Sequence, residues 1–196
     1  KGSLAAPGYS YQYIGGDATY VIIPNEVMEM GCLLHYSGES YFGGSLTEPL
    51  SCVAGTFHAM YHVTRGKYEH DMGIKEGGKM AILAGVGPMG LAAIDYIIHC
   101  DRRPSLLIVT DIDDARLARA EKLLSPKEAE ANGIKLVYAN TGKVENDHDF
   151  MMSFTDGTGY DDVLAFAPVA SVVELADSIL AQDGCLNFFA GPSNPE

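Results

Sequence analysis

The stretch that decides the fold is MAILAGVGPMG, which spans residues 80–90. Its first half, Met80 to Ala84, is a short apolar run typical of a buried strand. Pro88 to Cys100 then carries apolar residues at helical spacing. Between strand and helix lies a GxGxxG turn, made of Gly85, Val86, Gly87, Pro88, Met89 and Gly90.

This order of strand and helix continues to the end of the chain. We predict four further strands, at Leu106–Thr110, Lys135–Tyr138, Asp162–Ala165 and Cys185–Ala190. Helices are predicted between them, beginning at Asp113 or Asp114, at Pro126, at Asp149 and at Pro168, the last ending at Gly184. Strands that alternate with helices imply right-handed crossovers and a parallel sheet, so the predicted fold class is α/β.

The first 66 residues lack this alternation. We expect a strand at Ala18–Ile23 that ends at Pro24, a Gly/Ser/Tyr loop at Ser37–Gly44 and a helix at Pro49–Val63. A segment of this size is too small to close a hydrophobic core alone. It is therefore either a docking arm or the end of a second domain.

The glycine turn has the residues that a dinucleotide site needs. Gly85 permits a tight turn, Gly87 lets the backbone approach a pyrophosphate, and Gly90 lets the helix pack close to the strand. The start of the helix offers free N–H groups to phosphates. Asp111 ends the next strand about twenty residues on, where a carboxylate binds both ribose hydroxyls and repels a 2′-phosphate. The sequence therefore predicts NAD(H) binding in preference to NADP(H).

Composition narrows the class of partner. The chain of 196 residues has 13 Lys+Arg and 26 Asp+Glu, a formal net charge of −13, which argues against nucleic acid or an anionic membrane as a partner. The most apolar window, Ala81–Ile98, contains Asp95 and the glycine turn, so no membrane span is predicted. No two cysteines form a CxxC, and we expect reduced core residues of a cytoplasmic protein at Cys32, Cys52, Cys100 and Cys185.

Two other features have a plain interpretation from the residues alone. His58 and His62 are four residues apart on the predicted helix and could share a zinc ion, but the metalloprotease pattern lacks its Glu, which favours ordinary surface or interface histidines. Glu48 precedes Pro49 at a helix start, where the helix dipole stabilises a carboxylate.

Taken together, these motifs resemble the zinc-dependent medium-chain dehydrogenase/reductase family, near its sorbitol-dehydrogenase branch. The resemblance rests on four stretches in order, namely the strand Ala18–Pro24, Thr47–Cys52, Gly85–Gly90 and Asp111–Arg116. Gly43–Leu50 and Gly85–Ile98 are further similar to the bacterial L-sorbose-1-phosphate reductases within that family.

The resemblance implies a role for each of these residues. Gly85 to Gly90 would hold the pyrophosphate, and Asp111 and Arg116 would contact the adenosine ribose. Phe166 and Ala167 would lie along the cofactor. Glu48 matches the family's glutamate at or beside the catalytic zinc. The resemblance therefore favours a catalytic residue and metal ligand at Glu48 over a residue that only stabilises the helix start.

The resemblance also implies an arrangement of domains. Residues 1–51 would be the end of a GroES-like catalytic domain, and 52–196 a Rossmann-like doubly wound domain with five of its six strands. The family's Gly-His-Glu stretch and four-cysteine zinc lobe do not occur here, so we expect a fragment of a larger enzyme. That enzyme would be a homo-oligomer that reduces a small sugar phosphate, L-sorbose 1-phosphate to D-glucitol 6-phosphate, with zinc and NAD(H).

Two alternatives remain open at the level of sequence. A non-catalytic module that senses NAD(H) would use the same fold, and an upstream segment with Cys and Gly-His-Glu in the native gene would exclude it. A methyltransferase that uses S-adenosylmethionine also has a glycine-rich first turn, but its usual GxGxG would need glycine where Met89 stands.

Overall fold

The computed structural model describes residues 13–191 except 17 and 65. The chain divides into two units, Lys1–Glu48 and Pro49–Glu196. The described part of the first unit contains α1 (Asn25–Glu29) and α2 (Tyr41–Ser45). No helix among the described residues is long and apolar enough to span a bilayer.

Two predictions in the first unit are wrong. Residues 18–24 form no strand in the structure. Strands are stabilised by pairing, and no other strand lies in the described part of this unit. The predicted loop Ser37–Gly44 runs into α2, because the Ser40 hydroxyl accepts a hydrogen bond from the Gly43 N–H at 3.1 Å and caps the helix.

The helix α3 (Thr47–Ala59) is shorter than predicted. After it, β1 (Tyr61–Val63) pairs antiparallel with β2 (His70–Met72), so the prediction of a helix as far as Val63 is wrong. The three residues of β1 alternate exposed, buried and exposed, which is the period of a strand. The Gly73 N–H donates to the Met60 carbonyl at 2.8 Å and closes the hairpin at its base.

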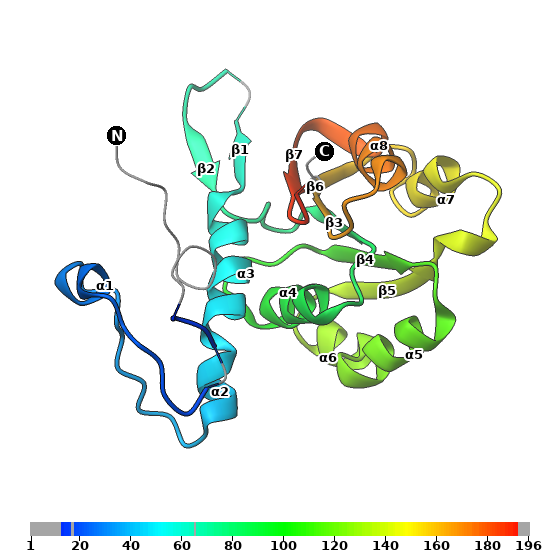
Figure 1. Cartoon of the computed structure of the whole chain (residues 1–196). Helices are drawn as coiled ribbons and strands as arrows, with labels where there is room; N and C mark the ends of the chain where they lie inside the picture. Colours follow the sequence, from blue (N-terminus) through cyan, green and yellow to red (C-terminus); the bar gives the residue numbers. More distant parts are fainter. Residues whose placement is uncertain (1–12, 17, 65, 192–196) are drawn as a thin grey trace. The chain divides into compact units, whose positions relative to one another are not determined.

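The second unit contains a five-stranded parallel sheet in its described residues (Figure 1). Its strands stand in the order β5-β4-β3-β6-β7. Because the chain order reverses between β3 and β6, the carboxyl ends of these two strands border a topological switch point, where ligands bind in open α/β sheets. The bounds of the strands are β3 Lys79–Leu83, β4 Leu106–Asp111, β5 Lys135–Asn140, β6 Tyr160–Ala165 and β7 Leu180–Phe188.

Helices cover both faces of this sheet. Along β3, Met80 and Ile82 belong to one core and Ala81 and Leu83 to the other, as the alternation of a strand requires. The first core includes buried residues of α3, α4 (Pro88–His99), α5 (Asp114–Leu123) and α6 (Pro126–Ala131). The second includes those of α7 (Asp147–Ser153) and α8 (Ala170–Ser178). The predicted doubly wound α/β fold is confirmed.

The last strand begins earlier than predicted. The expected helix from Pro168 to Gly184 ends at Ser178, and Leu180 pairs with Tyr160 as the first residue of β7. Between this pair and the next, β7 advances five residues while β6 advances two, and Asp183 takes a positive φ of 62° in the bulge. The helical spacing of apolar residues in α8 thus extends to Leu180, which belongs to the strand, and the prediction therefore placed the end of the helix too late.

The prediction that the cysteines are core residues is wrong for two of the four, since only Cys100 and Cys185 pack against the core. Cys32 and Cys52 are exposed, whereas Cys100 and Cys185 are half-buried. The thiol of Cys100 donates to the Arg102 carbonyl at 2.9 Å, just after the end of α4. Burial raises the pKa of the Cys100 and Cys185 thiols.

Candidate functional site

The glycine turn lies between β3 and α4 and is packed at its two ends. The Gly85 N–H donates to the Thr110 carbonyl at 3.0 Å, which ties the turn to β4. A Cβ atom added at Gly90 would lie 2.0 Å from the Gly85 carbonyl oxygen. No side chain fits at that distance, so Gly90 is required for the helix to approach the end of the strand.

The middle of the turn is open. Gly87 caps α4, with Pro88 as the first helical residue, and a Cβ at Gly87 would have the Arg116 guanidinium, 3.6 Å away, as its nearest neighbour. Val86 is buried and Met89 is partly buried against the core, so the turn would present backbone rather than these side chains to a ligand. An open backbone at a helix start fits a phosphate group.

Asp111 supplies a buried carboxylate at the end of β4. Its side chain is 4% exposed, and its Oδ1 accepts hydrogen bonds from the Ile112 N–H at 2.9 Å and the Asp113 N–H at 3.1 Å. Its Oδ2 lies 3.7 Å from Nη1 of Arg116. One oxygen therefore fixes the turn that follows β4, and the other faces the arginine.

The predicted site residues beyond the turn meet in one hollow. It has a volume of about 440 Å³ and lies at the carboxyl ends of the sheet strands. The Phe166 N–H donates to the Leu83 carbonyl at 3.0 Å, and the Phe166 ring stacks on Phe189 at 4.6 Å. The sequence-predicted residues that line the hollow are Asp111, Arg116, Phe166 and Ala167.

The chain is similar over nearly its whole length to curated bacterial enzymes. It is 53% identical over 96% of its residues to the mannitol-1-phosphate 5-dehydrogenase of Aliivibrio fischeri, and 48% identical over 97% to the L-sorbose 1-phosphate reductase of Klebsiella pneumoniae. It spans 45% of the length of each relative. No model of a known protein family matches it.

Solved structures share the fold. The zinc-dependent alcohol dehydrogenase 2 of Streptococcus pneumoniae has a TM-score of 0.56 and 23% identity, over 82% of this chain and 40% of that one. A Sinorhizobium meliloti protein solved with bound NADP has a TM-score of 0.56 and 18% identity, over 78% of this chain and 38% of that one. The chain shares the fold of these two structures, which belong to the medium-chain dehydrogenase/reductase family.

Glu48, proposed from the resemblance to this family as a zinc ligand, lies apart from the residues of the hollow in sequence. It is exposed, in the first turn of α3, and belongs to the first unit of the chain. Within residues 13–191, leaving out 17 and 65, no three His, Cys, Asp or Glu are grouped so that they could hold a metal ion. The described residues thus do not fit a complete zinc site, and the role of Glu48 as a metal ligand stays a proposal.

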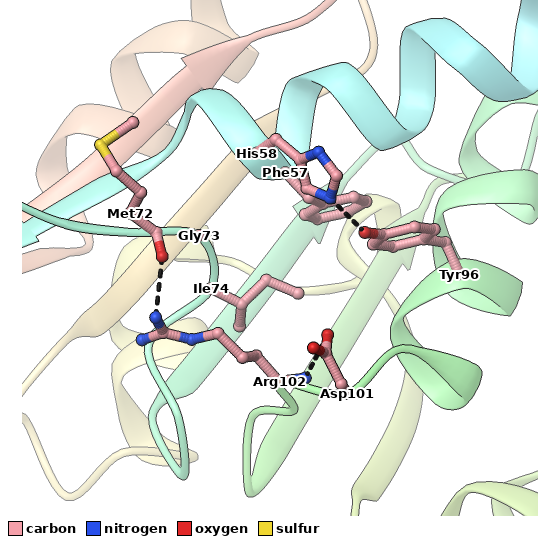
Figure 2. Close-up of a pocket in the computed structure, with 8 residues that line it drawn as sticks. All are labelled: Phe57, His58, Met72, Gly73, Ile74, Tyr96, Asp101 and Arg102. Atoms are coloured by element: carbon pink, nitrogen blue, oxygen red, sulfur yellow. Dashed lines mark hydrogen bonds between the residues drawn. The ribbon is translucent and has the colours of Figure 1, made fainter.

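The two histidines do not form the pair that the sequence allowed. His58 is on α3, where its Nε2 lies 3.1 Å from the Tyr96 hydroxyl (Figure 2). His62 is on β1 and buried, with its Nε2 2.9 Å from Oδ1 of Asp162. Because the helix ends at Ala59, the four-residue spacing no longer places both rings on one helix face.

His58 and Tyr96 help to line a second hollow, of about 260 Å³ (Figure 2). It lies near the carboxyl end of α4, where Arg102 binds the Asp71 carboxylate through both terminal nitrogens at 2.8 Å. Burial raises the pKa of the Tyr96 hydroxyl. Since the glycine turn is at the opposite end of α4, this hollow is separate from the candidate nucleotide site.

Sequence reasoning missed a polar cluster next to Asp111. Asn140 ends β5, and its Nδ2 donates to the Ile112 carbonyl at 3.2 Å and to the Asp114 carboxylate at 2.6 Å. Hydrogen bonds from Lys143 and Asn140 lower the pKa of Asp114. The available signal was a polar residue at the end of the third strand, at the same sheet edge as Asp111.

Proposed function

We propose that this chain is the NAD(H)-binding part of an oxidoreductase that acts on polyol phosphates and ketose phosphates. One arrangement carries the proposal: the open backbone at Gly87 and the buried carboxylate of Asp111 follow the neighbouring strands β3 and β4, and both lie beside the guanidinium of Arg116. A pyrophosphate and a ribose are the two groups that such a pair recognises.

Each part of the site then has a task. The backbone from Gly85 to Gly90 binds the pyrophosphate at the start of α4, where free N–H groups and the helix dipole favour anions. Asp111 accepts hydrogen bonds from the adenosine ribose, and Arg116 makes a second contact there. Phe166 and Ala167 border the path of the cofactor and exclude water from it.

The names of the relatives suggest the substrate class. Both relatives act, by name, on a six-carbon polyol or ketose that carries a phosphate. We propose the reduction of L-sorbose 1-phosphate to D-glucitol 6-phosphate for the whole enzyme. When bound, the nicotinamide supplies the hydride for the carbonyl carbon of the substrate. We propose that Glu48 contributes one side chain to a catalytic metal shell.

The domain assignment and the assembly belong to the same proposal. Residues 1–51 would be the end of a GroES-like catalytic domain, and 52–196 the nucleotide-binding domain. The intact enzyme would be a homo-oligomer in the cytoplasm that takes a small sugar phosphate or polyol.

A titration tests the proposal directly. Because the chain has no Trp, the emission of NADH itself reports its binding without interference from tryptophan. We expect NADH to bind, ADP-ribose to displace it, and NADPH to bind more weakly. Displacement by S-adenosylmethionine but not by ADP-ribose would support a methyltransferase instead. Failure of NADH to bind would overturn the proposal.

A further inference from the structure

The side chain of Asn140 uses both ends of its carboxamide, and the two ends serve different segments. Its Oδ1 accepts from the Gly142 N–H at 2.8 Å and caps the short helix η1 (Thr141–Lys143) that follows β5. Its Nδ2 donates to the Ile112 carbonyl and to Asp114, both in the turn between β4 and α5. Asn140 therefore joins the ends of two neighbouring parallel strands.

A second contact joins the same two segments. The ammonium group of Lys143, at the end of η1, binds the other carboxylate oxygen of Asp114. Ile112 also lies against Gly142, where an added Cβ would be 3.1 Å from the Ile112 Cβ. The turn after β4 is thus held by the segment after β5 at Ile112 and at Asp114.

This turn forms one wall of the proposed nucleotide site and carries Asp111, the carboxylate proposed to bind the adenosine ribose. Asp111 and Ile112 both line the 440 Å³ hollow, and Oδ1 of Asp111 is itself fixed by the backbone N–H groups of this turn. A shift of the Ile112 peptide would therefore move the carboxylate as well. We propose that Asn140 is a positioning residue that sets the adenosine-ribose subsite; this inference rests on the proposed function.

Only an amide side chain at position 140 can both accept the Gly142 N–H and donate to the Ile112 carbonyl. Aspartate at this position would keep the acceptor for Gly142 but lose the donor for Ile112. It would also place a second carboxylate 2.6 Å from that of Asp114. Alanine would lose both ends. N140D thus removes the two hydrogen bonds that Asn140 donates to the β4–α5 turn, while it keeps the cap of η1.

The test uses the 196-residue chain and a matched control. Asn146 caps α7 in the same way, accepting from the Asp149 N–H at 3.0 Å and donating to its carboxylate at 2.9 Å, but its bonds stay within that helix. We expect N140D and N140A to weaken NADH and ADP-ribose about tenfold. We expect N146A to leave both affinities within about twofold, and thermal unfolding of all variants provides the measure of a purely structural effect.

The ligand set separates the possible results. Reduced nicotinamide mononucleotide lacks the adenosine ribose, so its affinity should be the same in N140D and in the unsubstituted chain. Unchanged binding of ADP-ribose by N140D, or an equal loss in N146A, overturns the positioning role alone. If the unsubstituted chain does not bind NADH, the proposed function fails and the role of Asn140 fails with it.

Discussion

The carboxylate of Asp111 and the guanidinium of Arg116 lie 3.7 Å apart, with the aspartate buried and the arginine half exposed. The two charges oppose one another in cofactor choice, because the carboxylate repels a 2′-phosphate and an arginine nearby can accept one. Since Asp111 is the residue held in place by backbone hydrogen bonds, we expect it to decide the preference.

Replacing Asp111 by Ser should therefore reverse the preference. Loss of hydrogen bonds to a charged group should weaken NADH by about tenfold to a hundredfold. NADPH should bind the D111S variant more tightly than it binds the unsubstituted chain. Titration with both cofactors measures the ratio of the NADH and NADPH affinities. Adding R116A to D111S should remove the gain in NADPH affinity. A D111S variant that still prefers NADH would contradict the assignment of Asp111.

The glycines at 87 and 90 should respond differently to a methyl group. At Gly90 the new Cβ would meet the Gly85 carbonyl oxygen at 2.0 Å, so G90A should lower the free energy of unfolding by about 1–3 kcal/mol. Denaturant unfolding measures this loss. A stability equal to that of the unsubstituted chain would mean that the turn does not pack as described.

Gly87→Ala is the matched substitution for binding. Its Cβ would make only ordinary contact, 3.6 Å from Arg116, and Gly87 has a φ of −77° that alanine accepts. We expect G87A to keep its stability within about 0.5 kcal/mol. NADH should nevertheless bind at least about tenfold more weakly, because the methyl group would occupy the space needed for the pyrophosphate. Unaltered NADH affinity in G87A would place the phosphates elsewhere.

The sheet could be predicted from the sequence because each of its signals is local. The buried runs at Met80–Ala84 and Leu106–Thr110 and the glycine turn specify strand, turn and helix within a few residues. The turn and Asp111 were placed correctly at the ends of β3 and β4, because motif spacing and strand order agree.

The features that were predicted wrongly or missed depend on contacts with residues distant in sequence. The helix predicted through Val63 ends early because β1 pairs with β2 and His62 reaches Asp162, a hundred residues away. Leu180 continues the apolar period of α8 but pairs with Tyr160. Asn140 had no recognised motif, since its function depends on which strand lies beside β5.

Acid should weaken the contact between Asp71 and Arg102. The hydrogen bond from Arg102 holds the pKa of the Asp71 carboxyl below its ordinary value of 3.8. A carboxyl with a lowered folded pKa stabilises the fold above its unfolded pKa and loses this effect as the pH falls through the folded pKa. D71N should therefore be less stable than the unsubstituted chain at pH 7, and the difference should shrink as the pH falls through the lowered pKa of Asp71. Thermal unfolding across pH measures it; a difference that persists in acid would contradict this origin.

The buried pair of His62 and Asp162 should be the more costly contact to break. The two side chains are 3% and 1% exposed, and Oδ2 of Asp162 also accepts the Lys75 N–H at 2.9 Å. H62A would remove the imidazole from this buried carboxylate, which would keep the Lys75 N–H, and should lower the free energy of unfolding by about 3–5 kcal/mol. H58A, which removes an exposed imidazole from α3, should cost under about 1 kcal/mol. Denaturant unfolding measures the loss of stability in both variants. Equal losses would mean that the His62–Asp162 pair does not hold β1 against β6.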